Sequence, residues 1–177
     1  MQPPHQRGDE NGLIWHARSD VVGIAQRDAD DCYRTSAQML ANALPGPQRP
    51  NFDAPMFHHA GMQGNTVAKQ TIDRMLSLDF VDDVDEDVSR MESDKLFKAV
   101  VTALQNHGPL LATYTPDPVH PTAQHVVVVI GLATQVSTDH CLFMLRDPDP
   151  LKYHHIVAFQ FEGFQAKLLS LRYSRKF

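Results

Sequence analysis

Hydrophobic residues recur every three or four positions in three segments of the first 107 residues. This spacing places apolar side chains on one face of a helix, and it therefore predicts amphipathic α-helices. The predicted helices cover residues 31–43, 65–76 and 93–107. In the first helix Asp30 or Asp31 can act as the N-cap, and the Pro-Gly-Pro run at 45–47 prevents its continuation.

Polar residues and glycine mark the ends of the other two helices. Asn65 or Thr66 can cap the second helix, and Ser93 can cap the third. Gly108 suits the end of the third helix, because glycine readily adopts the left-handed conformation that often ends a helix. On the second helix the spacing turns four apolar side chains toward the core: Val67, Ile72, Met75 and Leu76.

After Gly108 the pattern changes to short apolar or β-branched runs that turn residues separate, which is typical of β-strands. Strands are predicted at residues 109–115, 124–133, 141–146, 155–161 and 168–173. Helices therefore come first and strands second, an order that favours an α+β domain with a mostly antiparallel sheet. The polar residues 1–20 are predicted to form an N-terminal arm, and residues 21–177 to form one domain.

The composition is that of an ordinary globular protein and argues against several functional classes. The chain has 177 residues, of which 42% are hydrophobic and 21% charged. Its formal net charge of -5 argues against a basic face for a nucleic-acid partner. No apolar run approaches the ~20 residues of a membrane span, and residues 1–20 lack the apolar core of a signal peptide. We expect a cytoplasmic protein, or one secreted without a Sec signal by a specialised secretion system.

The cysteine and histidine content limits which disulfide, metal and thiol chemistries the chain can carry. The two cysteines, Cys32 and Cys141, are too few for a disulfide framework and lack metal-site spacing, so a reduced thiol is favoured. The ten histidines include pairs at 58–59 and 154–155, but adjacent histidines in a strand point to opposite faces and no HExxH motif is present. We therefore predict no metal and no cofactor. The pair at 58–59 can instead line a substrate groove.

The residues around Cys32 indicate thiol chemistry. A cysteine in the first turn of a helix lies near unpaired backbone N–H groups, which favour a thiolate. Because Asp30 and Asp31 oppose this effect, a cationic partner is needed, and a histidine supplies one that also acts as acid and base. His125 opens a buried strand that holds it in place, and it is the best candidate for this partner.

Two further residues complete the candidate site. Asp147 follows the next strand, where a hairpin returns beside His125, so its carboxylate can accept the Nδ1 proton. Gln26 precedes Cys32 by six residues, and its amide can donate to a developing oxyanion together with the Cys32 backbone N–H. Taken singly, each residue also has an ordinary structural interpretation, as a core cysteine, a core histidine, a turn aspartate or a loop glutamine.

The start of this site resembles a known family. Gln26, Cys32 followed by the aromatic Tyr33, and Ser36 are similar to the beginning of the papain-like cysteine peptidase core. Two of its branches look most similar: the double-glycine peptidases that process bacteriocin leaders, and the avirulence cysteine proteases of plant pathogens. The avirulence proteases share the aromatic residue after the cysteine, whereas double-glycine peptidases usually have glycine there.

The second half of the chain carries the rest of the resemblance. The Gln-His-Val-Val-Val run at 124–128, followed by Gly131, resembles the histidine strand of the clan, and the Arg-Asp-Pro run at 146–148 resembles the Asp-Pro of its smaller bacterial branches. The resemblance implies a papain-like fold, in which an N-terminal helical part with the nucleophile helix packs on a C-terminal antiparallel sheet. It implies these catalytic residues: Cys32, His125, Asp147 and Gln26.

These features predict a thiol hydrolase that cleaves a peptide or isopeptide bond in a protein or peptide substrate. A secreted bacterial effector or toxin is one such enzyme, and a cognate inhibitor or immunity protein would be a further partner. Other thiol chemistries on the same fold stay open, namely those of a cell-wall amidase, a glutamine deamidase or a transglutaminase. A non-catalytic binding module that retains the fold also stays open.

Overall fold

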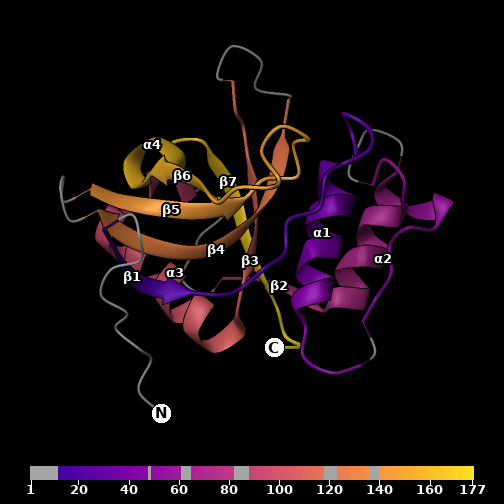
Figure 1. The fold of residues 1–177 in the computed structure, drawn as a ribbon, viewed down its shortest axis with the longest axis horizontal. Helices are drawn as coiled ribbons and strands as arrows, with labels where there is room; N and C mark the ends of the chain where they lie inside the picture. The colour runs from indigo at the N-terminus through magenta and orange to yellow at the C-terminus, as the bar shows by residue number, and fades with distance from the viewer. Residues whose placement is uncertain (1–11, 48, 61–64, 82–87, 118–122, 136–139) are drawn as a thin grey trace.

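The fold is a β-sheet that carries helices on both of its faces. The computed structural model describes residues 12–47, 49–60, 65–81, 88–117, 123–135 and 140–177. Its elements are β1 (Leu13–Arg18), α1 (Cys32–Ala43), η1 (Pro55–Phe57), α2 (Thr66–Leu76), β2 (Leu78–Phe80), η2 (Val88–Arg90), α3 (Ser93–His107), β3 (Leu110–Tyr114), β4 (His125–Gln135), β5 (His140–Arg146), β6 (Val157–Gln160), α4 (Phe161–Gln165) and β7 (Leu168–Ser174). Helices α1 and α2 lie side by side at one end of the molecule (Figure 1).

Antiparallel pairing builds the sheet throughout the described part of the chain. The strand order is β2-β7-β3-β4-β5-β6, and β1 pairs with β4 outside this path. Strand β4 is the longest: β3 pairs with its first half and β1 with its second half along the same edge. The α+β class, with a helical part on an antiparallel sheet, is confirmed.

Strand β1 differs from the expected N-terminal arm. Residues 1–11 of that arm lie outside the described residues, but Leu13–Arg18 pair with β4. The segment alternates buried and less buried residues, with Leu13, Trp15 and Ala17 inward, which is the period of a half-buried strand. Because β3 covers only the first half of that edge of β4, the backbone groups of the second half are paired by β1 instead.

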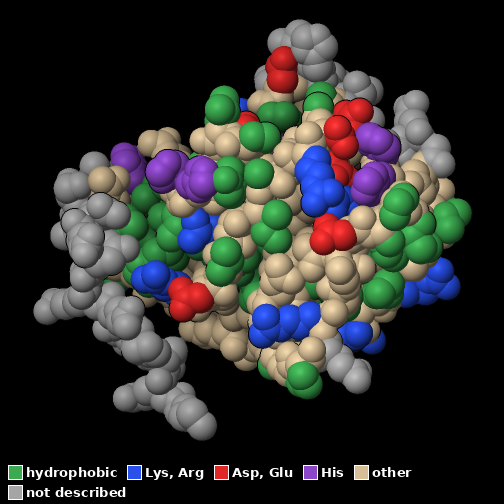
Figure 2. Space-filling model, turned by 45° about the vertical axis from the view of Figure 1, so that its right-hand side comes forward, with side chains coloured by type: hydrophobic (Ala, Val, Ile, Leu, Met, Phe, Trp, Pro, Cys, Tyr) green, Lys and Arg blue, Asp and Glu red, His purple; other side chains and the backbone are tan. Residues whose placement is uncertain are grey.

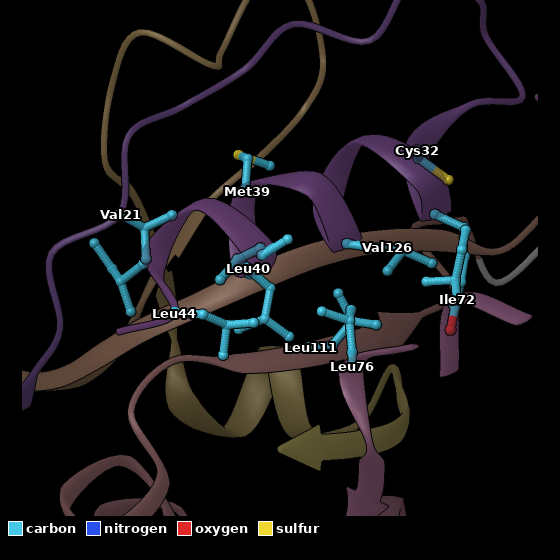
Figure 3. Close-up of a cluster of buried hydrophobic side chains, with 14 of the residues drawn as sticks. Val21, Cys32, Met39, Leu40, Leu44, Ile72, Leu76, Leu111 and Val126 are labelled. Atoms are coloured by element: carbon cyan, nitrogen blue, oxygen red, sulfur yellow. The ribbon is translucent and has the colours of Figure 1, made fainter. Parts of the chain in front are cut away.

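Two apolar clusters hold the helices on the sheet. In the first, Leu40 of α1 and Ile72 of α2 pack with Leu111 and Val126 of the sheet. Figure 3 shows this cluster, with Cys32 at one end of it near Val126 and Ile72. The second cluster joins α3 and α4 to the sheet. Each fully buried Leu or Ile side chain stabilises the fold by about 1.5–3 kcal/mol, so both faces contribute to stability.

The predicted helices are confirmed, and their ends differ in two details. Asn65 caps α2, since its side chain accepts a hydrogen bond from the Ala68 N–H at 3.2 Å, and Gly108 follows α3 with a φ of 65°. Ser93 does not act as a cap: its hydroxyl is directed to Gln165 at 3.0 Å. Val67 is 69% exposed rather than inward, because α2 packs through Ala68, Ile72 and Leu76.

Candidate active site

Helix α1 brings Cys32 to the beginning of β4. Cys32 is the first residue of α1, and Ser36 lies one turn later on the same face of the helix. The buried Ser36 hydroxyl donates a hydrogen bond to the Val126 carbonyl oxygen at 2.8 Å. Because Val126 follows His125, this bond sets the first turn of α1 beside the first residue of β4. The sequence alone left Ser36 without a role.

A buried ion pair offsets the charge that Asp31 places beside Cys32. Asp31 occupies the N-cap position of α1, but its side chain makes no capping hydrogen bond. It accepts a hydrogen bond from Arg34 Nε at 2.7 Å instead, and the same guanidinium reaches Asp53 at 3.1 Å. Both Asp31 and Arg34 are buried, so their interaction is weakly screened. The Arg34 guanidinium thus partly neutralises the negative charge beside Cys32 that opposes a thiolate.

Asp147 orients the imidazole of His125. It directly follows β5, and because β5 runs antiparallel to β4, the end of β5 returns beside the start of β4. The fully buried carboxylate of Asp147 places Oδ1 2.7 Å from His125 Nε2. The expected contact through Nδ1 is therefore wrong. With Nε2 engaged by Asp147, Nδ1 is the nitrogen left for the Cys32 thiol.

The imidazole contacts the carboxylate and the thiol together. Besides its bond to Asp147, His125 lies close enough to the Cys32 side chain for Cys32 to influence the pKa of the ring. Burial disfavours the charged imidazole, but the hydrogen bonds and charges of Asp147 and Cys32 outweigh burial and raise the pKa of His125 to about 9. Burial also acts against the Asp147 carboxylate, yet the His125 hydrogen bond holds the pKa of Asp147 below its ordinary value. An imidazolium is therefore available beside Cys32 at neutral pH.

Gln26 lies on the loop that enters α1, next to the segment that follows Asp147. Its backbone N–H donates to the Pro148 carbonyl oxygen at 2.8 Å, which joins the two loops. Its side-chain amide donates to the Ala29 carbonyl oxygen at 3.1 Å, and its Oε1 is buried without a hydrogen-bond partner in the described residues. The amide is thus close in sequence to Cys32 and engaged locally, and its role as an oxyanion donor stays a prediction.

Tyr114 is a site residue that sequence reasoning missed. It pairs with His125 across β3 and β4, and the two rings meet edge to face with centroids 5.7 Å apart. Burial, followed by the charges of Asp147 and Cys32, raises the pKa of the Tyr114 hydroxyl, so this group stays neutral. The ring thus packs against one side of the imidazole. Only the register of β3 against β4 could have revealed this neighbour.

Tyr33, the residue after Cys32, belongs to a buried polar network. Its hydroxyl donates to Asp73 of α2 and accepts a hydrogen bond from Arg172 of β7 at 3.0 Å. Arg172 also donates to Asp73 at 3.0 Å, and Lys69 bonds to Asp73 at 2.9 Å. The side chain that follows the nucleophile therefore ties the first turn of α1 to a second helix and to the sheet.

The other sequence candidates lie apart from this group. Cys141 is half-buried in β5, and burial raises the pKa of its thiol to about 11. His59 is exposed, and His58 is partly buried with its Nε2 unpartnered among the described residues. That these two histidines line a substrate groove stays a prediction. The described residues hold no group of three or more His, Cys, Asp or Glu side chains placed to bind a metal.

The described surface fits the charge balance of the sequence. Lys and Arg side chains are interspersed with Asp and Glu on the face that Figure 2 presents, and histidines gather at two places on it. Within the described ranges, the helices are all too short or too polar to cross a membrane. The acidic stretch at 79–94 lies partly outside the described residues.

The fold and the side chains that it brings together indicate the class of the protein. The chain supplies glutamine, cysteine, histidine and aspartate in the papain-like order, and the last three meet in space as the thiol chemistry of a cysteine peptidase requires. A family model described as the papain-like cysteine protease AvrRpt2 matches residues 15–168, which is most of the chain. The chain belongs to this family of cysteine peptidases.

Comparison with individual proteins adds little to the family assignment. One solved structure that matches is that of a double glycine motif protease from an AMS/PCAT transporter, in complex with the leader peptide. It is 14% identical, with a TM-score of 0.36, and the match covers 88% of this chain and 91% of that one. The curated proteins include no significant match.

Proposed function

We propose that this cysteine peptidase cleaves a peptide or isopeptide bond with Cys32 as the nucleophile, His125 as the acid and base, and Asp147 as the orienting group. The observation that carries the proposal is the position of the His125 imidazole, hydrogen-bonded to Asp147 and near enough to Cys32 to be affected by it. Asp147 keeps the ring in one orientation, and its charge stabilises the imidazolium. The substrate is a protein or a peptide, as the family assignment favours.

The proposed reaction has two halves. The Cys32 proton passes to His125, the sulfur attacks the carbonyl carbon, and the carbonyl oxygen becomes an oxyanion. The C–N bond then breaks, His125 protonates the leaving amine, and an acyl thioester remains on Cys32. In the second half His125 takes a proton from water, the resulting hydroxide attacks the thioester, and the acid product leaves as Cys32 is restored.

Backbone and side-chain donors near Cys32 are suited to the oxyanion. The first-turn N–H groups of a helix have no intrahelical partner, so the Cys32 N–H is free to donate. We assign the second donor to Gln26, whose amide has to turn from the Ala29 carbonyl oxygen toward the substrate. If this assignment is right, Gln26→Ala lowers kcat by about 100-fold or more, while Gln26→Asn, with a shorter reach, restores little.

The direct test uses a quenched fluorescent casein and an electrophilic thiol reagent. We expect Cys32→Ala and His125→Ala to abolish casein cleavage, and the matched control Cys141→Ala to retain it. Iodoacetamide should label Cys32 faster than Cys141, and His125→Ala should remove this difference. Equal cleavage by the wild-type protein and Cys32→Ala would overturn the proposal.

Assays with other substrates distinguish a peptidase from enzymes with other thiol chemistries. Ammonia release from a glutamine-containing peptide without chain cleavage would indicate a deamidase, and cleavage of muropeptides would indicate an amidase. A wild-type protein in which Cys32 reacts no faster than a free thiol, and in which His125→Ala has no effect, would indicate a binding module.

For the biological setting we propose a bacterial effector or toxin, delivered by a specialised secretion system and restrained by a cognate inhibitor or immunity protein. What supports this setting is that a peptidase acting on proteins needs restraint in the cell that makes it. Expression in a susceptible cell should be toxic with the wild-type chain and harmless with Cys32→Ala. Equal growth with both would contradict this setting without affecting the peptidase assignment.

A further inference from the structure

The turn after β5 supplies a cation to the carboxylate that orients His125. Asp147 Oδ1 accepts hydrogen bonds from His125 Nε2 at 2.7 Å and from the Asp149 N–H at 3.0 Å. Asp147 Oδ2 is buried and has no hydrogen-bond partner among the described residues. Lys152 Nζ lies 3.6 Å from this oxygen, beyond hydrogen-bond length but within the range of a strong charge interaction.

The backbone of the turn holds Lys152 in this position. The Lys152 N–H donates to the Asp149 carbonyl oxygen at 2.8 Å, and the Leu151 N–H donates to Asp149 Oδ1 at 2.9 Å. Lys152 Nζ is 3.1 Å from Asp149 Oδ2, so the ammonium bridges two carboxylates. Pro148 and Pro150 restrict the backbone on either side of Asp149. A local structure of a few residues thus fixes a charge next to the site.

We propose that Lys152 is a positioning residue that sets the proton affinity of the His125–Asp147 pair, and thereby the pH range of activity. The inference rests on the proposed function, because it assigns a role to the Asp147–His125 contact in turnover. It acts through charge: the ammonium stabilises the Asp147 carboxylate and opposes protonation of the imidazole behind it.

The direction of the effect follows from the groups that face the imidazole. Asp147 and Cys32 favour the imidazolium, and the neutral Tyr114 ring adds no charge. Asp149, in the turn that follows Asp147, carries a further negative charge. Lys152 is the cation that the structure places against Asp147. Removing it leaves the carboxylates uncompensated, so the pKa of His125 rises and deprotonation of the imidazole moves to higher pH.

The test is the pH dependence of kcat/KM with the quenched casein, at low salt and in 1 M NaCl. Lys152→Met should move the basic limb up by about 0.3–0.5 pH unit at low salt, a modest shift because the lysine is half exposed. Lys152→Arg should restore the wild-type limb. At 1 M salt, where the Debye length is about 3 Å, the difference between wild type and Lys152→Met should shrink.

Two further variants make the test specific. Asp149→Asn keeps an oxygen for the Leu151 N–H but removes a negative charge, so the basic limb should move in the opposite direction, to lower pH. Lys95→Met removes the same charge from α3, an element of the second apolar cluster, and should leave the limb unchanged. A purely structural role for Lys152 would lower kcat/KM at every pH and move no limb. That result, or a shift of the same sign in Lys152→Met and Asp149→Asn, would overturn the inference.

An NMR titration of the His125 ring keeps this inference distinct from the proposed function. It measures the pKa of His125 directly and needs no turnover. If Cys32→Ala retains all activity but Lys152→Met still raises the pKa of His125, the proposed function fails and the charge effect stands. If activity depends on Cys32 but neither the pKa nor the limb changes in Lys152→Met, the inference fails and the proposed function stands.

Discussion

At the scale of single residues, the site depends on one imidazole that faces two partners through different ring nitrogens. His125 uses Nε2 for Asp147, which leaves Nδ1 for Cys32, as the proposed proton transfer from sulfur to ring requires. Burial works against the charged ring, and the two partners reverse that effect. Between pH ~6.5 and 9 the ring is therefore charged in the folded protein and mostly neutral in the unfolded chain, which links protonation to stability.

This linkage predicts how the free energy of unfolding depends on pH. The pKa of His125 is about 9 in the folded protein and about 6.5 in an unfolded chain. Its contribution is therefore complete below pH ~6.5 and is lost as the pH rises through 9, by up to about 3 kcal/mol. Urea denaturation at several pH values should show this loss, and His125→Ala should remove most of the slope between those limits. An unchanged slope in that variant would contradict the assigned pKa.

Removal of the Asp147 charge tests the orienting role. Asp147→Asn keeps an oxygen for the His125 ring but no longer stabilises the imidazolium. We expect kcat/KM to fall by about 100-fold or more, and the pKa of His125 to fall toward its ordinary value. Steady-state kinetics with the quenched casein and the NMR titration of His125 measure the two effects separately. A pKa that stays near 9 in Asp147→Asn would be inconsistent with this role.

At the scale of elements, the first turn of α1 is held from two sides. Ser36 bonds to β4, and Tyr33 bonds to Asp73 of α2 and to Arg172 of β7. The network places charges in a mostly buried environment, where each needs its partner. Contacts with α2, β4 and β7, which are distant in sequence from α1, thus fix the position of Cys32.

The network predicts unequal costs for its members. Tyr33→Phe removes one hydroxyl but leaves the Asp73–Arg172 pair, so it should lower the free energy of unfolding by about 1–2 kcal/mol. Asp73→Ala leaves the Arg172 guanidinium without its carboxylate and should cost more, about 3–5 kcal/mol. Chemical denaturation gives both values. If Tyr33→Phe lowered the free energy of unfolding as much as Asp73→Ala or more, the hydroxyl would contribute more to stability than the ion pair.

The pairing of β1 with β4 predicts intolerance at Gly131. A Cβ atom built there would lie 2.4 Å from the Trp15 ring and 2.5 Å from the Ala17 carbonyl oxygen. Gly131→Ala must therefore push β1 away from β4, at a cost of about 1–3 kcal/mol in denaturation experiments. Gly163→Ala is the matched control, because no atom lies within 4 Å of its built Cβ. Equal stability of the two variants would contradict this packing.

At the scale of the whole molecule, periodic segments were predictable and distant contacts were not. The helices at 31–43 and 65–76 and the strand that His125 opens follow from spacing that is visible in the sequence. The strand at Leu13–Arg18 was not predicted, because the alternation of Leu13, Trp15 and Ala17 is short and adjoins a polar segment, as in an unpaired arm. Whether that segment pairs depends on which edge of β4 the other strands leave open.

The candidate site divides in the same way. The sequence order predicted Cys32, His125 and Asp147, and the structure brings these three together. It could not predict the ring nitrogen that Asp147 engages, nor the neighbours Tyr114 and Lys152, because these depend on strand register and on turn geometry. Gln26 was chosen by its offset from Cys32, and that role still awaits its kinetic test.

The packing of Trp15 gives the protein an intrinsic optical probe. The sequence has one tryptophan, which is 5% exposed between β1 and β4, with the Arg18 guanidinium 4.9 Å from the ring centre. Its emission therefore reports on how β1 lies against Gly131 of β4 and on the first apolar cluster, to which Trp15 belongs. A red shift at lower urea concentration than the loss of ellipticity would reveal that β1 detaches before the rest of the domain unfolds.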